Sequence, residues 1–292
     1  MTWIIAGGSG QLGTALDQEL TRLRQEHHSL SSKQLDISDA QQVDGISLLN
    51  PSVIVNCAAW TDVEGAESHP EECRKLNISG ALNLADLARR LKIPFIQIST
   101  DYVFSGYRER PWEAMDITNP TSIYGASKAE AERLILNLYP EGSCIIRTAW
   151  LYSPWRKNFA KTILKRAAQK LPSKVVNDQY GQPTSARDLA GKICELFQEQ
   201  PRVGIFHGTN SGVATWFEFA QEIYRLAGAD TWLVDPVSSE EFPTKVVRPT
   251  YSVLSHQMWH GVGLREMQDW RIALTSVFPE ILDEVSRELA NA

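Results

Sequence analysis

A tyrosine and a lysine four residues apart are the side chains best suited to chemistry in this chain of 292 residues. Tyr124 and Lys128 open a segment with helical periodicity, and residues at this spacing share one face of a helix. A free tyrosine has a pKa of about 10, and a neighbouring cation favours its phenolate form. The pair therefore predicts a phenol that works as a general acid, with a lysine that stabilises the tyrosinate.

A threonine lies where a third catalytic side chain is expected. Thr100 directly follows the apolar run 95–99, which reads as a buried strand, and Asp101 and Tyr102 come next. In open α/β sheets, ligands bind at the carboxyl ends of such strands. The sequence therefore predicts that the hydroxyl of Thr100 donates a hydrogen bond to a carbonyl oxygen of a bound substrate.

Three glycines near the N-terminus have the spacing of a phosphate-binding loop. Gly7, Gly10 and Gly13 follow the apolar run 2–6 and open a run with helical periodicity. Glycines let the backbone approach a pyrophosphate closely, and the helix N-terminus then holds it. A tight turn uses the same residues, but the strand–loop–helix context favours a dinucleotide. The G-x-x-G-x-x-G spacing resembles that of the short-chain dehydrogenase/reductase superfamily.

The residues after the second expected strand, near 29–31, bear on the choice of dinucleotide. Ser31, Ser32 and Lys33 offer two hydroxyls and a cation, where a carboxylate would repel a 2′-phosphate. This composition predicts NADPH as the cofactor, with NADH also accepted. Lys128 reaches the ribose of the nicotinamide. Asp36 and Ile37 suit the rim of the adenine, because the carboxylate accepts from its amine and the isoleucine covers its face.

The elements that must position these residues alternate along the first half of the chain. This order predicts a Rossmann-type, doubly wound parallel sheet of the α/β class, covered on both faces. From about residue 150 the alternation loosens and Trp and Pro become denser, which predicts a smaller, mostly helical C-terminal substrate lobe. We expect a dinucleotide-binding domain over 1–150 with a return near 182–208, and the lobe over 151–181 and 209–292. The expected strands are 2–6, 29–31, 53–59, 95–99 and 144–148, and the expected helices include 78–92 and 125–138.

The composition argues against several classes of protein. Lys and Arg number 29 and Asp and Glu 35, a net charge of −6, which disfavours nucleic-acid binding. No apolar run reaches the ~18 residues of a membrane span, and the N-terminus lacks the basic region of a signal peptide. Four widely spaced cysteines without a C-x-x-C pair are typical of reduced thiols. A cytoplasmic enzyme without nucleic-acid or membrane partners is expected.

Motifs along nearly the whole chain resemble the dTDP-4-dehydrorhamnose reductase family, whose members reduce the C4 ketone of a dTDP-sugar. The resemblance implies NADPH as cofactor and a dTDP-4-keto-6-deoxy-L-sugar, dTDP-4-dehydrorhamnose, as substrate. The C-terminal motifs belong to the sugar-nucleotide lobe and are more specific than the glycine loop. The motifs include Gly7–Gly13, Leu35-Asp36-Ile37, Ser99–Phe104, Tyr124 with Lys128, Arg147–Trp150, Asn158–Thr162, Asn177–Thr184, Trp216–Ala220, Phe242-Pro243-Thr244 and Arg248-Pro249.

The resemblance also implies roles for individual residues. The glycine loop with Gln11 and Leu12 binds the cofactor pyrophosphate, and Ala58, Ala59 and Thr61 lie along the cofactor. The resemblance also places Thr100, Asp101, Tyr102 and Trp150 in the substrate site, with Tyr124 as the proton donor.

The chain departs from the family pattern at several positions. Asp62 is an additional acid, and Gly65 stands where relatives usually carry lysine, so the residues over the nicotinamide differ. Some relatives are dimers bridged by a metal through glutamates. Ala15 and Arg187 occupy the matching positions here, so we expect no metal and either a monomer or a metal-free homodimer.

Three other functions fit parts of this pattern. A 4-keto reductase of another dTDP-deoxysugar would share every motif above. A dehydratase or epimerase of the same superfamily is a second possibility, and a dehydratase needs a second carboxylate after Asp101, where this chain has Tyr102. A non-catalytic regulatory subunit, like the methionine adenosyltransferase beta subunit that resembles this family, would not need Thr100, Tyr124 and Lys128 together.

Overall fold

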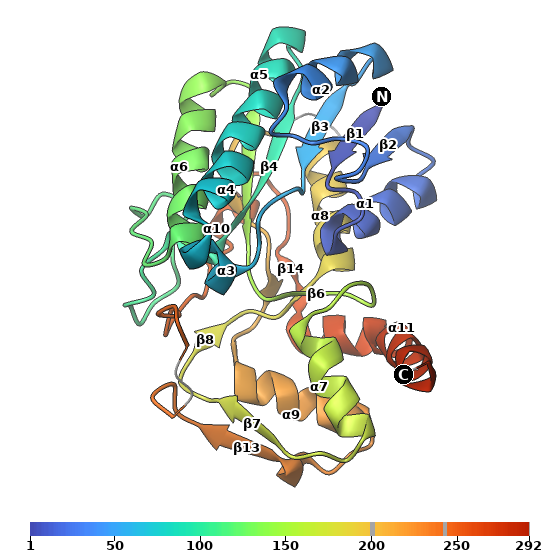
Figure 1. Ribbon diagram of the computed structural model, residues 1–292, viewed down its shortest axis with the longest axis vertical. Coiled ribbons are helices and arrows are strands. Elements are labelled where there is room, and N and C mark those ends of the chain that lie inside the picture. Colours follow the sequence, from blue (N-terminus) through green and yellow to red (C-terminus); the bar gives the residue numbers. More distant parts are fainter. Residues whose placement is uncertain (199–201, 242–243, 292) are drawn as a thin grey trace.

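A parallel sheet forms the centre of the larger part of the molecule (Figure 1). The computed structural model describes residues 1–198, 202–241 and 244–291, so Phe242 and Pro243 of one motif above lie outside the described residues. Within the described residues, six strands pair in parallel throughout. In spatial order they are β10 (Gly204–His207), β5 (Ser143–Thr148), β4 (Phe95–Thr100), β3 (Val53–Asn56), β1 (Trp3–Ala6) and β2 (His27–Leu30).

Helices cover both faces of this sheet, as the Rossmann-type prediction requires. Leu16 of α1 (Gln11–Arg22) and Leu189 of α8 (Ala186–Gln198) pack in one core cluster with Trp259 of α10 (Gln257–Gly261). The opposite cluster joins the sheet to α2 (Ala40–Gly45), α5 (Ala81–Leu91) and α6 (Ile123–Leu138). The predicted fold class is therefore confirmed, and Trp259 shows that the chain returns to the sheet after residue 208.

The order of the strands reverses beside β1. The chain passes from β1 to β2 on one side and then places β3 on the other side of β1. Ligands of open α/β sheets bind outside the carboxyl ends of the strands at such a reversal. The glycine loop after β1, the segment after β3 and Thr100 at the end of β4 all lie at this edge.

Several predicted boundaries differ from the structure by a few residues. The helix expected over 78–92 is α5, and a π-helix over Lys75–Gly80 precedes it and continues from α4 (Pro70–Arg74). The strand expected over 53–59 ends at Asn56, because that side chain turns back to accept a hydrogen bond from Ala58 N at 3.0 Å. Before α4, α3 spans Val63–Ser68, and two 3-10 turns span Ile46–Leu49 and Asp101–Val103.

A smaller lobe packs below the sheet domain in Figure 1. Its core combines Leu164 of α7 (Phe159–Ala168), Phe219 of α9 (Trp216–Leu226) and Leu274 of α11 (Trp270–Ala290). Short strand pairs join these helices to each other and to the sheet domain. The pairs are β7 (Ser173–Val176) with β13 (Val234–Val237), β8 (Tyr180–Gly181) with β12 (Ala214–Thr215), β6 (Leu151–Tyr152) with β9 (Thr184–Ser185), and β11 (Asn210–Ser211) with β14 (Met267–Asp269); a 3-10 turn spans Thr231–Leu233. Among the described residues, no helix combines the length and the apolar character needed to cross a bilayer.

Candidate active site

The glycine loop is packed so closely that side chains would not fit. Gly7 has φ +78°, and a Cβ there would lie 2.6 Å from Ala58 N. A Cβ at Gly13 would lie 2.3 Å from Gly7 O. Gly10 is the N-cap of α1 and offers no side chain to the first turn, so the N-terminal amides of the helix are left for a ligand.

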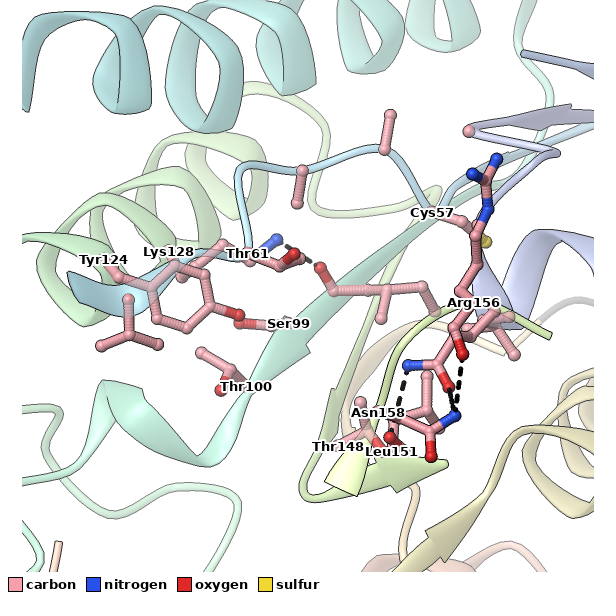
Figure 2. Close-up of a pocket in the computed structure, with 18 of the residues that line it drawn as sticks. Cys57, Thr61, Ser99, Thr100, Tyr124, Lys128, Thr148, Leu151, Arg156 and Asn158 are labelled. Atoms are coloured by element: carbon pink, nitrogen blue, oxygen red, sulfur yellow. Dashed lines mark hydrogen bonds between the residues drawn. The ribbon is translucent and has the colours of Figure 1, made fainter. Parts of the chain in front are cut away.

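A cavity of about 910 Å³ extends from this loop to the smaller lobe. Figure 2 shows Tyr124 and Thr100 at one end of it and Arg156 and Asn158 at the other. The structure thus brings almost all of the predicted residues to one cavity. Those that line the cavity are Gly7, Gly10, Gln11, Leu12, Ser32, Asp36, Ile37, Ala58, Ala59, Thr61, Thr100, Asp101, Tyr102, Tyr124, Lys128 and Trp150.

Two predicted residues do not line the cavity. The hydroxyl of Ser31 donates to Gln34 Oε1 at 2.7 Å, and its amide donates to the same oxygen at 3.0 Å. Lys33 is exposed in the turn that follows. Of the three residues expected to read the ribose, only Ser32 therefore belongs to the cavity wall.

The start of α6 is fixed by two side chains that cap it. Ser122 Oγ accepts from Gly125 N at 3.1 Å, and Glu67 Oε1 from α3 accepts from Ile123 N at 2.8 Å. Gly125 allows a close approach to the neighbouring turn, since a Cβ there would lie 2.2 Å from Tyr102 O. These contacts hold the first turn of α6, and with it Tyr124, against the end of β4.

Tyr124 stands at the cavity wall as a neutral phenol. Its ring packs edge-to-face on Tyr102, with 5.8 Å between the ring centroids. Desolvation raises the pKa of Tyr124 above its ordinary value, and the nearby Asp101 carboxylate also raises it. The phenol is therefore protonated at neutral pH and can donate a proton.

Lys128 lies one turn further along α6 and is buried, with 3% of its surface exposed. Its Nζ donates to Ile98 O at 2.6 Å. Burial lowers the pKa of Lys128 to about 8, against the opposing effect of the Glu132 carboxylate. The side chain thus carries its charge at neutral pH and loses it just above.

Thr100 and Asp101 form a hydrogen-bonded pair at the end of β4. Thr100 Oγ1 donates to Asp101 Oδ1 at 3.0 Å and accepts from Tyr102 N at 3.2 Å. Burial raises the pKa of Asp101 to about 6. The proton of Thr100 therefore points to the carboxylate in this structure, and the hydroxyl must turn to meet a carbonyl oxygen.

Three buried oxygens of the cavity wall have no hydrogen-bond partner in the described part of the chain. They are Ser99 Oγ, Asp101 Oδ2 and Thr148 Oγ1. Leaving a buried polar atom unpaired costs about 1–3 kcal/mol, so such atoms are expected where a polar ligand completes their bonding. The cavity wall therefore offers these three oxygens to a polar ligand.

Trp150 forms the wall toward the smaller lobe. It has the left-handed backbone angle φ +45° and stacks on Trp216, with 3.6 Å between the ring centroids. Gly181 makes room for it, because a Cβ there would lie 2.5 Å from the indole. Its predicted place beside the substrate is consistent with this position on the cavity wall.

The unusual pair Asp62 and Gly65 has a local structural explanation. Asp62 is the N-cap of α3 and accepts from Gly65 N at 2.9 Å. A Cβ at Gly65 would lie 2.3 Å from Asp62 Oδ2. The added acid and the lost lysine therefore belong together, since the capping carboxylate occupies the space of a side chain at position 65.

Several residues at or near the cavity had no individual role predicted from the sequence, although Asn158 and Trp216 open two of the motifs above. They are Arg156, Asn158 and Trp216, which line the cavity, and Asn77 close by. Asn77 Oδ1 accepts from Trp60 N at 2.8 Å and holds the segment before Thr61. Asn158 precedes an apolar helical run, which is the signal of an N-cap, and it does cap α7. Its Nδ2 also donates to Gln11 Oε1 at 3.0 Å, a contact across 147 residues that no local pattern encodes.

The two positions that match metal ligands in some relatives bind no metal through their own side chains. Ala15 lies on the buried face of α1, and Arg187 on α8 pairs with Glu280 on α11. Within the described residues, no cluster of three or more His, Cys, Asp or Glu side chains could hold a metal ion.

Comparison with known proteins finds reductases of dTDP-sugars that match nearly the whole chain. A dTDP-4-dehydrorhamnose reductase of Streptomyces griseus is 38% identical over 98% of this chain and 95% of its own length. A dTDP-4-keto-6-deoxy-D-glucose reductase of Streptomyces niveus is 38% identical over 95% of this chain and 96% of its own.

A solved structure and a family model extend the similarity to the whole fold. The crystal structure of the dTDP-4-dehydrorhamnose reductase of Bacillus anthracis, in complex with NADP, superimposes with a TM-score of 0.91. It is 35% identical and the match covers 96% of this chain and 99% of that one. The family model described as the RmlD substrate binding domain matches residues 1–282. With nearly its whole length matched, the chain belongs to the RmlD substrate binding domain family.

Proposed function

We propose that this protein is an NADPH-dependent reductase of the C4 ketone of a dTDP-4-keto-6-deoxy-L-sugar. Its substrate is dTDP-4-dehydrorhamnose and its product dTDP-L-rhamnose, as the names of the relatives from Streptomyces griseus and Bacillus anthracis suggest. The observation that carries the proposal is the meeting of Thr100, Tyr124 and Lys128 in the cavity that the glycine loop opens.

The residues present fit a dinucleotide. The glycine loop leaves no room for side chains, and the first amides of α1 border the cavity. Ser32, Asp36 and Ile37 line its far end, where an adenosine would lie. Bound NADPH supplies a hydride, which is chemistry that amino-acid side chains do not provide.

Tyr124 and Lys128 handle the proton in this reaction. As the ketone carbon is reduced, negative charge develops on its oxygen, and the neutral phenol of Tyr124 donates a proton to that oxygen. The ammonium of Lys128 then stabilises the tyrosinate that is left. Both side chains lie on one face of α6, so their relative position does not depend on the approach of the substrate.

Thr100 and its neighbours hold the sugar. The hydroxyl of Thr100 turns from Asp101 and donates to the ketone oxygen, where it stabilises the developing charge. Asp101 Oδ2 accepts from a sugar hydroxyl, with Tyr102 beside it, and Trp150 covers the sugar nucleotide from the other side. Ala58, Ala59 and Thr61 lie along the cofactor.

The division of the chain follows the same proposal. Residues 1–150, with the return near 182–208, form the dinucleotide-binding domain, and residues 151–181 and 209–292 form the sugar-nucleotide lobe, apart from α10, which packs on the sheet domain. We further propose that the protein works in the cytoplasm as a monomer or a metal-free homodimer, without nucleic-acid or membrane partners.

A coupled assay tests the proposed reaction. The purified protein receives NADPH and the product of a dTDP-glucose dehydratase and a 3,5-epimerase, and cofactor oxidation is followed at the nicotinamide absorbance. NMR of the product is expected to identify dTDP-L-rhamnose. Absence of NADPH oxidation with this substrate, by protein shown to bind NADP⁺, would contradict the proposal.

A second candidate function has its own support. The relative from Streptomyces niveus is named dTDP-4-keto-6-deoxy-D-glucose reductase and is as similar to this chain as the relative from Streptomyces griseus. Both activities would use Thr100, Tyr124 and Lys128 in the same way. Omitting the epimerase from the assay separates them, because rapid reduction of the unepimerised ketosugar would favour the second candidate.

The remaining alternatives make different predictions. A dehydratase or epimerase would convert its substrate without net NADPH consumption, and a dehydratase needs a second acid where this chain has Tyr102. A regulatory subunit would bind a dinucleotide without turnover. Steady oxidation of NADPH by the protein alone excludes both.

A further inference from the structure

Arg156 is a cation of the cavity wall that the proposed reaction does not yet use. It lies in the segment between β6 and α7, on the smaller lobe, and its side chain spans the cavity toward the glycine loop (Figure 2). Its Nε donates to Ser9 O at 2.7 Å. The two Nη atoms have no hydrogen-bond partner among the described residues, and Arg156 takes part in no ion pair there.

The position of this guanidinium favours the binding of an anion. Ser9 directly precedes Gly10, the N-cap of α1, so the cation lies beside the positive end of that helix dipole. The first turn of α1 contains no acidic side chain that would neutralise the guanidinium and the positive end of the helix dipole. A phosphate between the helix N-terminus and the guanidinium would be attracted by both.

The backbone at Arg156 is held in a conformation that arginine rarely adopts. Its φ is +60°, in the left-handed region that favours glycine. The neighbouring segment is anchored to α1, because Ser153 Oγ donates to Gln11 Oε1 at 2.8 Å and Gln11 Nε2 donates to Leu151 O at 3.3 Å. On the other side of Arg156, Asn158 Nδ2 donates to the same Gln11 Oε1 at 3.0 Å. The chain is therefore fixed on both sides of a strained residue whose side chain reaches the glycine loop.

We propose that Arg156 binds the pyrophosphate of the dinucleotide and closes the cavity over the glycine loop. Nε keeps its bond to Ser9 O, and the Nη groups donate to the phosphate oxygens from the face opposite the amides of α1. Cofactor binding thereby joins the smaller lobe to the sheet domain. The inference rests on dinucleotide binding at the glycine loop, as proposed above.

Direct binding measurements test this assignment. Calorimetry gives the dissociation constants of NADP⁺, NAD⁺ and dTDP for the native chain and for Arg156→Gln. A lost charge-assisted hydrogen bond of about 1.5–3 kcal/mol weakens binding roughly 10- to 100-fold. We expect that loss for NADP⁺ and NAD⁺ alike, since both contain the pyrophosphate, and an unchanged constant for dTDP.

Arg24 provides a matched control. It is also an exposed arginine in the left-handed region, with φ +55°, but it lies at the C-terminal end of α1. Arg24→Gln makes the same change of charge and shape, and it is expected to leave all three constants unchanged. Equal melting temperatures of the two variants would show that both remain folded.

The other outcomes overturn the inference in distinct ways. Unchanged NADP⁺ binding in Arg156→Gln would show that Arg156 does not contact the cofactor. Weaker binding of NADP⁺ but not of NAD⁺ would place Arg156 at the 2′-phosphate. Weaker binding of dTDP alone would place Arg156 at the substrate. If the native chain binds neither dinucleotide, the proposed function itself fails, whatever the variant does.

Discussion

The ionisable side chains around Tyr124 share one physical influence, which is removal from water. Burial raises the pKa of Asp101 to about 6 and lowers that of Lys128 to about 8, and desolvation also raises the pKa of Tyr124. Each group is shifted toward its neutral form. Near neutral pH the phenol is protonated while the lysine keeps its charge, and this combination is the one that proton donation requires.

Removing the phenol hydroxyl tests Tyr124 as the proton donor. Tyr124→Phe keeps the ring that packs on Tyr102, so the fold and NADP⁺ affinity should be preserved. Turnover is expected to fall by about 10²- to 10⁴-fold, the usual contribution of a general acid. Steady-state rates with the coupled substrate measure it. Turnover equal to that of the native chain would mean that another group supplies the proton.

The charge of Lys128 predicts a pH dependence. Its pKa is about 8 in the folded protein, so kcat should decline as pH rises through that value and the tyrosinate loses its cation. The same shift affects stability with the opposite sign. Between pH 8 and 10.5 the unfolded chain binds more protons at this lysine than the folded one, so its contribution to the free energy of unfolding rises with pH.

Lys128→Met isolates that contribution. The variant lacks the titrating group, so the difference in unfolding free energy between native and variant should shift in favour of the native chain from pH 8 to 10.5. Urea unfolding at both ends of this range measures it. A constant difference would show that Lys128 has an ordinary pKa in the folded state.

We expect Ser32 to influence the choice between NADPH and NADH. Ser32 lines the cavity, whereas its neighbours Ser31 and Lys33 do not. Ser32→Asp places a carboxylate where a 2′-phosphate would lie, so the ratio of kcat/KM for NADPH to that for NADH should fall. Ser31→Asp should have the smaller effect, because Ser31 bonds to Gln34. If Ser32→Asp leaves the ratio of kcat/KM for the two cofactors unchanged, this turn does not contact the adenosine ribose or its 2′-phosphate.

Among the elements, α6 depends on a glycine for its position. Ser122 and Glu67 satisfy its first amides, and Gly125 brings the helix against the turn of Tyr102. Alanine is normally the better helix former by about 1 kcal/mol. Here a Cβ would lie 2.2 Å from Tyr102 O, and a backbone carbonyl cannot move aside as a flexible side chain can.

Gly125→Ala is therefore expected to destabilise the protein by about 1–3 kcal/mol, as overpacking does, and to reduce turnover by displacing Tyr124. Gly45→Ala is the matched control, since a Cβ at the end of α2 would meet no atom within 4 Å. Thermal unfolding compares the two variants. Equal melting temperatures for both would contradict the close approach of α6 to the turn.

At the scale of the whole molecule, the cavity exists because two lobes meet over the glycine loop. The side chain of Gln11 is central to that meeting, because it bonds to Leu151 O, Ser153 and Asn158 of the crossing segment. The family resemblance implies that Gln11 lies at the pyrophosphate. Its backbone amide is available for that role, while its side chain joins the lobes.

Chelation tests the expectation of a metal-free molecule. Ala15 has no ligating atom, and the Arg187 guanidinium pairs with Glu280. Treatment with EDTA should leave turnover and the sedimentation behaviour of the protein unchanged. Loss of either property, with recovery on addition of Mg²⁺, would contradict it and would point to metal ligands other than these two positions.

The sequence by itself determined the sheet domain and the chemistry of its edge. The spacing of Gly7, Gly10 and Gly13, the Tyr124–Lys128 pair and the strand that ends at Thr100 are local patterns, because a helix or strand places nearby residues on predictable faces. The resemblance of the later motifs to those of reductases extended the functional prediction to the substrate lobe.

Only the tertiary structure decided how the cavity is closed and which protonation states it favours. The bond between Asn158 and Gln11 joins residues 147 positions apart, and Arg156 meets Ser9 across the same distance. The shifted pKa of Lys128 depends on burial, and the orientation of Thr100 on the carboxylate of Asp101. Such features arise from packing between distant segments, which leaves no periodic signal in the chain.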